Sequence, residues 1–505
     1  MGQMPLVSFL LAWSPLFLII LLAVGFKWSA LKLGTAGLIY TCLLSLFWFK
    51  TGFKVVLLSA LDGAVTTLPA TLVVFFAIIL SVLLIESGAL TRIVAWIGSG
   101  LKDPWQRTLG LSAGVGNFLE GSGLVAEPVA APMLTASGVA PYKAAVLSIQ
   151  GYAGLFSLEL AGAVMAVLVA ASGLDIYILS WDSALISILP TFFLIFTIPW
   201  FMGEASALKG RVWLFLYTGV VLNLVTVLLV LLGGFPVSAM TAGLVFLALL
   251  MIRGRKGLKV QGGLWRDLMP FAFIIFALLA VNLFPPVRRL TFEGVVLPLQ
   301  VIPIHTIRLR PAFDAYTYLF LAFILGLLVL RPGLKRGAKI AARGLWQGLL
   351  VAIVMGLFGA VGQVVAYSGY APDFASLDPT RNMAHILAQG VSRYSGHIYP
   401  LFAPLLGWAG TVITGYGTAS VLLFGGLQVT TAQLIGLPPT LLAGSLAVGG
   451  GVGSISSPFK LAIAASVCGA RGQEGLALRK TIPLGIAAAL VTGGWTMLLQ
   501  FLSDM

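Results

Sequence analysis

The chain has 505 residues, of which 59% are apolar and 9% are charged, and its net charge is +14. This composition excludes an ordinary soluble enzyme, whose surface needs more charge, and no basic soluble domain is present to bind nucleic acid. Apolar runs of about 20 residues recur along the chain, and each is long enough to cross a bilayer as a helix. We therefore expect an all-α polytopic membrane protein of the inner or plasma (cell) membrane.

Taken in chain order, the apolar runs predict about 12 transmembrane helices, the first of them retained rather than cleaved. Between these spans, the stretches 105–137 and 395–435 are each too long for one span and too rich in Gly and Pro for two. They are predicted to be re-entrant helical hairpins, which survive in a membrane when buried in protein or lining a wet cavity. The predicted spans lie at about 6–26, 29–49, 69–89, 139–172, 183–202, 212–232, 235–252, 268–284, 315–331, 345–367, 437–470 and 481–501.

Two segments, 114–156 and 412–454, resemble one another at an offset of 298 residues. Each copy has a small polar elbow, followed by a helix that opens after Gly-x-x-Pro and is broken by glycines. Paired, interrupted apolar segments of this kind point to the substrate site of a transporter. The elbows are Glu120-Gly121-Ser122 and Thr418-Ala419-Ser420, and the paired positions include Leu124/Leu422, Gly138/Gly436, Pro141/Pro439, Ala145/Ala443 and Gly151/Gly449.

Basic residues in short loops predict which side faces the cytoplasm. Those assigned to the cytoplasmic side are Lys27, Lys32, Arg92, Lys102, Arg107, Lys209, Arg211, Arg253, Arg255, Lys256, Lys259, Arg331, Lys335, Arg336, Lys339, Arg343, Arg471, Arg479 and Lys480. The exceptions are Lys50, Lys54, Arg288, Arg289, Arg308 and Arg310. Because seven predicted spans separate the hairpins, the second would enter from the opposite face, which makes the repeats inverted.

Acidic residues inside the membrane portion are the sharpest chemical signal. A charge at the bilayer centre costs about 2.5–3.5 kcal/mol on insertion scales, so Glu120, Glu127 and Glu159 are candidates for proton coupling. A buried carboxyl group can pick up and release a proton during a transport cycle. The alternative is a structural carboxylate that pairs with a basic residue or with backbone N–H groups.

Elbows and broken helices expose backbone N–H groups that suit an anion. The candidate substrate-binding residues are Gly121, Ser122, Gly151, Tyr152, Thr418, Ser420, Ser456, Ser457 and Lys460. The alternative role for each hydroxyl group is a hydrogen bond to the preceding helical turn. The alternative for Lys460 is that its side chain extends to the membrane interface.

The remaining motifs predict neither a cofactor nor a metal site. The three histidines, His305, His385 and His397, are scattered. His397 precedes the second hairpin and could titrate near neutrality, which makes it a proton-coupling candidate, or it could be an interfacial hydrogen-bonding residue. The glycine run 449–453 lacks the ending of a phosphate loop, so an ATP-driven pump is excluded.

The two repeat segments resemble the lactate permease family. This resemblance implies proton-coupled uptake of lactate and related 2-hydroxy monocarboxylates such as glycolate, and an elevator architecture in which a scaffold domain dimerises. The matching residues are Phe118-Leu119-Glu120-Gly121, Pro128-Val129, Gly396-His397, Pro404-Leu405-Leu406-Gly407-Trp408, Thr414-Gly415, Thr418, Ser420, Phe424, Leu427-Gln428, Ala432-Gln433, Ile435-Gly436, Ser457-Pro458 and Ala462-Ile463-Ala464.

The chain departs from the family pattern at the expected substrate site. Gly417 stands for an Asp, Val421 for an Asn, Ser454 for a Lys, Gly151-Tyr152 for Asn-Thr and Glu127 for a small residue. The mechanism therefore carries over better than the substrate does.

The resemblance divides the chain into five parts. These are N-terminal spans, mainly scaffold (1–104); the first hairpin and broken helix, transport repeat 1 (105–172); intervening spans, partly scaffold (173–394); the second hairpin and broken helix, transport repeat 2 (395–470); and a C-terminal span (471–505).

Other functions stay open beside proton-coupled monocarboxylate uptake. One is a sodium-coupled transporter or an exporter of another organic anion, such as a sulfonate or dicarboxylate, on the same fold. A channel is another. A membrane enzyme is disfavoured, because neither long loop, 285–312 or 368–394, shows paired acids or His–Asp chemistry.

Overall fold

The computed structural model describes residues 6–24, 26, 28–101, 103–253, 263–415 and 417–503. Five of the basic residues used above to orient the chain, Lys27, Lys102, Arg255, Lys256 and Lys259, lie outside these described residues. Helices dominate the described part, and buried apolar side chains run through it as one large core with smaller clusters beside it.

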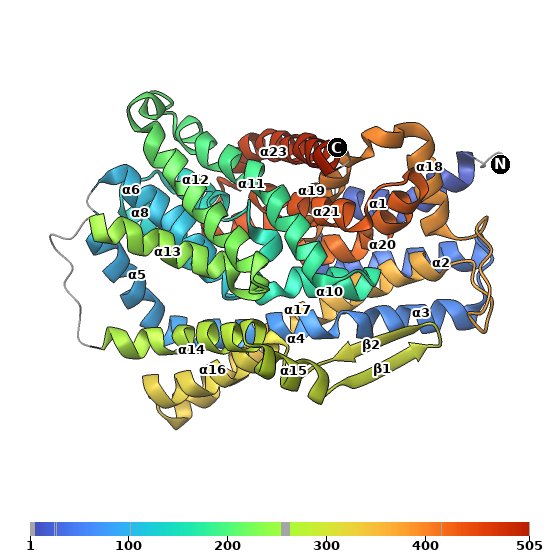
Figure 1. The fold of residues 1–505 in the computed structure, drawn as a ribbon, viewed down its shortest axis with the longest axis horizontal. Helices are drawn as coiled ribbons and strands as arrows, with labels where there is room; N and C mark the ends of the chain where they lie inside the picture. The colour runs from blue at the N-terminus through green and yellow to red at the C-terminus, as the bar shows by residue number, and fades with distance from the viewer. Residues whose placement is uncertain are drawn as a thin grey trace.

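The helices form two packed groups. Figure 1 shows α3, α4, α14 and α16 of the first group along one side of the molecule and α11, α12 and α23 of the second along the other. The first group contains α1 (Leu6–Val24), α2 (Ala30–Phe47), α3 (Phe53–Thr66), α4 (Leu68–Glu86), α5 (Ala89–Gly100), α14 (Leu264–Leu283), α15 (Pro285–Gly294), α16 (Ala315–Leu330) and α17 (Leu334–Tyr367). Within it, α17 packs on α2, α3 and α4, and α16 packs on α4 and α14.

The second group holds both predicted repeats. It contains α6 (Pro104–Leu109), α7 (Gly116–Gly121), α8 (Glu127–Ala136), α9 (Pro141–Gln150), α10 (Ala163–Ser172), α11 (Ile176–Met202), α12 (Ala207–Leu231), α13 (Ser238–Arg253), α18 (Met383–Ser395), α19 (Ala403–Thr414), α20 (Gly417–Ile435), α21 (Pro439–Gly453), α22 (Pro458–Cys468) and α23 (Glu474–Ser503). Short helices join them: the π-helix η1 (Gly110–Val115) and the 3-10 helices η2 (Phe156–Leu158), η3 (Leu160–Gly162), η4 (Phe235–Val237), η5 (Gly396–Leu401) and η6 (Ser454–Ser456).

The polytopic character of the chain is confirmed. Among the described residues, seven helices are long and apolar enough to cross a membrane, and up to nine if each of two bent pairs is one span. All seven spans predicted between the hairpins coincide with a helix or a broken helix. The prediction missed α3 and α5, because α3 is short and carries Lys54 and Asp62, while α5 carries Arg92 among its apolar residues.

The internal repeat reappears in the helix boundaries. Helices α9 and α21 begin at Pro141 and Pro439, and helices α11 and α23 begin at Ile176 and Glu474, so both pairs are 298 residues apart. Gly138 and Gly436 stand before the two prolines with φ of +94° and +73°, a left-handed conformation that favours glycine. Proline then suits the first turn, where its missing N–H is not needed.

Both predicted broken helices are broken in the structure. Helix α9 ends before Gly151, and the chain passes through η2 and η3 before α10 begins at Ala163. Helix α21 ends at Gly453, and α22 follows after η6 with a bend of 40°. The breaks leave backbone polar groups outside a regular ladder, which a membrane tolerates where protein or a cavity surrounds them.

The first predicted hairpin consists of α6, η1 and α7, a turn at 122–126, and α8. The second consists of α19 and α20, but its elbow is not at Thr418-Ala419-Ser420 as expected. The chain turns at Gly415, which has a φ of +83°, and Thr418 and Ser420 lie in the first turns of α20. Only glycine adopts that conformation at low cost, so Gly415 ends α19 before the polar residues are reached.

The segment predicted as the loop 285–312 is structured. It holds α15 and an antiparallel hairpin of β1 (Leu297–Ile302) and β2 (His305–Leu309), in which Leu297 pairs with Leu309. His305 ties this hairpin to both helix groups: its Nδ1 lies 2.8 Å from Asp62 Oδ2 of α3, and its Nε2 lies 3.2 Å from the carbonyl oxygen of Ala170 in α10.

This contact predicts a pH-dependent stability. The hydrogen bond with Asp62 raises the pKa of His305 above its usual value. The stabilisation is therefore complete below the unfolded pKa of about 6.5 and is lost as pH rises through the folded pKa. We expect His305→Gln to cost about 1.5–3 kcal/mol at pH 6 and less at pH 9, measured by thermal unfolding in detergent. An equal loss at both pH values would contradict the ion pair, and His385→Gln, in a half-buried residue of α18, is the matched control.

Candidate functional site

Lys460 is placed by the break between α21 and α22. Pro458 opens α22, and Ser457 caps it with an extended backbone and a side-chain oxygen that accepts the Lys460 N–H at 3.4 Å. The Lys460 side chain is 7% exposed, so it does not extend to the molecular surface. Helix α22 packs on α8 and α9, and the ammonium group therefore meets residues of the first repeat.

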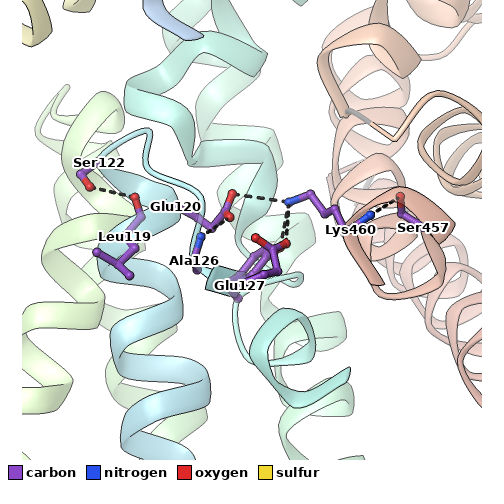
Figure 2. Close-up of polar contacts among 8 residues, drawn as sticks. Leu119, Glu120, Ser122, Ala126, Glu127, Ser457 and Lys460 are labelled. Atoms are coloured by element: carbon purple, nitrogen blue, oxygen red, sulfur yellow. Dashed lines mark hydrogen bonds and ion pairs between the residues drawn. The ribbon is translucent and has the colours of Figure 1, made fainter. Parts of the chain in front are cut away.

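The Lys460 ammonium group is shared among three side chains of the first repeat. Its Nζ donates to Tyr152 Oη at 2.7 Å and lies 3.5 Å from both Glu120 Oε2 and Glu127 Oε1. Figure 2 shows the two carboxylates facing Lys460 from the other side of the gap between the repeats. This cluster joins residues that are more than 300 positions apart in the chain.

The two acids of the cluster are held differently. Glu120 lies in the last turn of α7, and its Oε1 accepts the Ala126 N–H at 2.9 Å, across the turn and at the positive N-terminus of α8. Glu127 is the first residue of α8, and its Oε1 accepts the Tyr152 hydroxyl at 2.6 Å. Both acids lie 3.5 Å from the ammonium group, but Glu127 also accepts a short bond from a neutral hydroxyl, whereas Glu120 accepts a backbone N–H.

Aromatic rings line the Lys460 side of the cluster. Lys460 Nζ lies 4.8 Å from the ring centre of Tyr152 and 4.4 Å from that of Phe156, within the range of a cation–π contact. Tyr152 follows Gly151, which packs so closely on η1 that a Cβ there would lie 2.3 Å from the Ser112 carbonyl carbon. We infer that Gly151 serves the close approach that positions Tyr152.

Glu159 lies in the break between η2 and η3, fully buried, and neither of its carboxylate oxygens has a hydrogen-bond partner among the described residues. It lies close enough to Glu120, Glu127 and Lys460 to interact with them electrostatically. The next residues, Leu160 and Ala161, have φ of +53° and +51°. Strained non-glycine backbone of this kind clusters at functional sites.

A cavity of about 420 Å³ borders this cluster, between α4 and α17 of the first group and the α7–α8 turn, α20 and α22 of the second. Glu120, Thr418 and Lys460 line it from the second group. Ser81 of α4 and Gln347 of α17 add polar groups from the first group. The other lining residues are Val74, Ile78, Val82, Ile85, Gly123, Val125, Pro128, Phe156, Leu160, Val351, Gly417, Phe459 and Ile463.

Several predicted binding residues have local structural partners. Ser122 donates to the Leu119 carbonyl oxygen, Ser420 to that of Gly407 and Ser456 to that of Thr481, at 2.7–2.8 Å. Gly121 packs against α13, where a Cβ would lie 2.4 Å from the Met240 nitrogen. His397 is exposed in η5 and is not among the residues that line the cavity. Substrate or proton roles for these five residues stay predictions.

The sequence-based reasoning missed Phe156, Ser81 and Gln347. Phe156 stands four residues after Tyr152, a spacing that places two side chains on one face of a helical turn and could have revealed it. Ser81 and Gln347 lie in spans that show no break, so no local signal singles them out. Among the described residues, no three His, Cys, Asp or Glu side chains are grouped to hold a metal ion.

Comparison with known proteins relates nearly the whole chain to one protein family. A family model described as L-lactate permease matches residues 8–503. The glycolate permease GlcA of Escherichia coli K12 is 29% identical over 215 residues, which is 42% of this chain and 36% of the relative. The L-lactate permease of Streptococcus iniae is 26% identical over 81% of this chain and 87% of its own length.

The extent of the match differs among the relatives. The L-lactate permease of Halalkalibacterium halodurans is 24% identical over 98% of this chain and 97% of its own length. The L-lactate permease of Escherichia coli K12 is 34% identical, but the match covers 28% of this chain and 24% of that protein. The matches to the two Escherichia coli permeases thus span 36% and 24% of those proteins, whereas the Streptococcus iniae and Halalkalibacterium halodurans matches extend over 87% and 97% of theirs.

Proposed function

The chain belongs to the L-lactate permease family, and from this premise we propose that it is a secondary active transporter that takes up lactate- and glycolate-type 2-hydroxy monocarboxylates with protons by alternating access. As a permease-family chain with several helices able to span a bilayer, it is a multi-pass protein of the cell membrane. One observation carries the proposal: the buried Lys460 ammonium group borders a cavity and faces two acids.

The substrate carboxylate would displace Glu120 from Lys460. The 3.5 Å separation of Glu120 Oε2 and Lys460 Nζ is longer than the roughly 2.7–2.9 Å of a strong charged hydrogen bond. Glu120 also lines the cavity, whereas Glu127 is held by Tyr152 and is not among the lining residues. An entering anion can therefore reach Lys460 most directly by replacing Glu120. Thr418, which also lines the cavity, would hydrogen-bond the substrate.

Displacement of Glu120 would couple the substrate to a proton. Once separated from Lys460, Glu120 keeps its bond from the Ala126 N–H and its contact with the second acid, Glu127, but loses its cation, and an unpaired buried charge is costly. The carboxylate would then bind a proton as the substrate anion enters, so that the loaded site gains no net charge. A neutral load is cheaper to move through a membrane than an anion alone. Glu159, whose carboxylate oxygens accept no hydrogen bond from the residues that the structure describes, is a second candidate to carry a proton.

The proposal extends to the architecture. It includes about 12 spans, two re-entrant hairpins in inverted repeats, the scaffold and transport division given above, an elevator movement and a homodimer. The equal 298-residue spacing of helix starts, the two broken helices and the position of the cavity between the two helix groups support it. Sodium coupling, export, or a sulfonate or dicarboxylate substrate is not favoured, since the relatives are named for lactate and glycolate.

The proposal is tested by the protons that accompany binding. We expect purified protein to take up about one proton per L-lactate bound, and its affinity to rise as pH falls, because binding shifts one group to its protonated form. Calorimetry in two buffers with different protonation enthalpies measures this number. An equal binding enthalpy in the two buffers, or binding that requires sodium, would reject proton coupling through this site.

A further inference from the structure

The cavity beside Lys460 is large for the smallest members of the proposed substrate class. Its volume of about 420 Å³ falls in the range of roughly 300–1,000 Å³ that encloses drug-sized ligands. Glycolate has no side-chain carbon beyond its hydroxyl-bearing carbon, and lactate has one methyl group, so either would leave most of this space unfilled.

Helix α4 supplies a mostly apolar wall of the cavity, in which Ser81 is the one polar residue among the described lining residues. Val74, Ile78 and Val82 are spaced four residues apart on α4, which places them along one helix face. Ile85 of α4 and Val351 of α17 continue the same wall. The charged lining residues, Glu120 and Lys460, come from α7 and α22 instead, and Thr418 and Gln347 also line the cavity. The cavity thus combines a buried cation suited to a carboxylate with a mostly apolar helix face suited to hydrocarbon.

We propose that this protein prefers 2-hydroxy monocarboxylates with an extended apolar side chain, such as branched-chain or aromatic 2-hydroxy acids, over glycolate and lactate. The carboxylate would lie at Lys460, and the side chain would lie along Val74, Ile78 and Val82. This inference rests on the proposed function, since it assumes that the cavity is the substrate site.

The proposal predicts a chain-length series. Each methylene group that leaves water for the apolar wall should tighten binding about three- to fourfold. We expect the inhibition constants against labelled L-lactate uptake in proteoliposomes to fall from glycolate through 2-hydroxybutyrate to 2-hydroxyisocaproate and 3-phenyllactate. Equal inhibition across the series, or weaker inhibition by the longer acids, would overturn the preference.

Two variants of the α4 wall locate the effect. Val82→Phe fills the cavity, and Ile78→Ala removes apolar contact, so both should lower the ratio of 2-hydroxyisocaproate to glycolate uptake, Val82→Phe by at least about tenfold. Val212→Phe, at an exposed position of α12, should leave the ratio unchanged. Monodisperse elution from a sizing column shows that each variant is folded.

The outcomes separate this inference from the function beneath it. If the wild type transports none of these acids, the proposed function fails. In a second outcome, the wild type transports L-lactate and glycolate, but the inhibition constants do not fall with side-chain length and the two wall variants leave the ratio of 2-hydroxyisocaproate to glycolate uptake unchanged. In that case the proposed function stands and the preference for extended side chains is wrong.

Discussion

Replacing Lys460 with Met should abolish uptake of L-lactate in proteoliposomes, to the level of liposomes without protein. The substitution removes the ammonium group that the substrate carboxylate would bind and leaves Glu120 and Glu127 without their shared cation. Breaking a buried ion pair by removing one partner typically costs about 3–5 kcal/mol, so we also expect a lower temperature of thermal unfolding in detergent.

A double variant separates the two losses. Lys460→Met combined with Glu120→Gln removes one charge of each sign, so it should recover most of the thermal stability while uptake stays absent. Lys480→Met is the matched control, since Lys480 lies on α23 and is exposed, with its ammonium group near half-buried Tyr142. L-lactate uptake by Lys460→Met at more than about a tenth of the wild-type rate would exclude Lys460 as the main anion-binding group.

Replacing Glu120 with Gln should uncouple transport from protons. Gln keeps the shape of Glu120 and can still accept the Ala126 N–H, but it cannot bind and release a proton. We expect a pH gradient to drive no accumulation of L-lactate in this variant, whereas exchange of internal for external L-lactate should continue. Both are measured with labelled L-lactate in the same proteoliposomes.

The control for this substitution is Glu204→Gln, at an exposed acid between α11 and α12, which should leave both activities intact. Unchanged pH-driven accumulation by Glu120→Gln would remove Glu120 from the coupling role and direct attention to Glu159. Loss of exchange together with accumulation would instead indicate that Glu120 is needed to bind or move the substrate.

Local backbone signals could be predicted from the sequence. Pro141 and Pro439 begin their helices because proline suits a first turn, and Gly138 and Gly436 precede them with positive φ. These signals act within a few residues, so one chain is enough to detect them. The second elbow was misplaced because Gly415, and not the polar residues after it, supplies the turn.

The partners of the site residues could not be predicted in the same way. Glu120 and Lys460 were each notable as charges in apolar surroundings, but their contact spans 340 residues and depends on how the repeats pack. Hydroxyl groups were ambiguous for a related reason. Ser122 and Ser420 both satisfy backbone carbonyl groups, and only three-dimensional packing distinguishes this use from a bond to substrate.

The His305 contact shows the same limit for longer distances. His305 stood alone in a predicted loop, and Asp62 interrupted an apolar run that was not recognised as a helix. Their pairing depends on the β1–β2 hairpin lying against α3. Neither residue has a neighbour in sequence that points to the other, so no reading of periodicity could join them.

In the proposed mechanism, the substrate anion and a proton share the Lys460–Glu120 site. The most direct measurement is the accumulation of labelled L-lactate in proteoliposomes under an imposed pH gradient, acidic outside, compared with an imposed sodium gradient at equal pH. We predict accumulation above the external concentration with the pH gradient, its loss when an ionophore collapses that gradient, and no accumulation with sodium. Accumulation driven by sodium, or uptake that never exceeds the external concentration, would contradict the account.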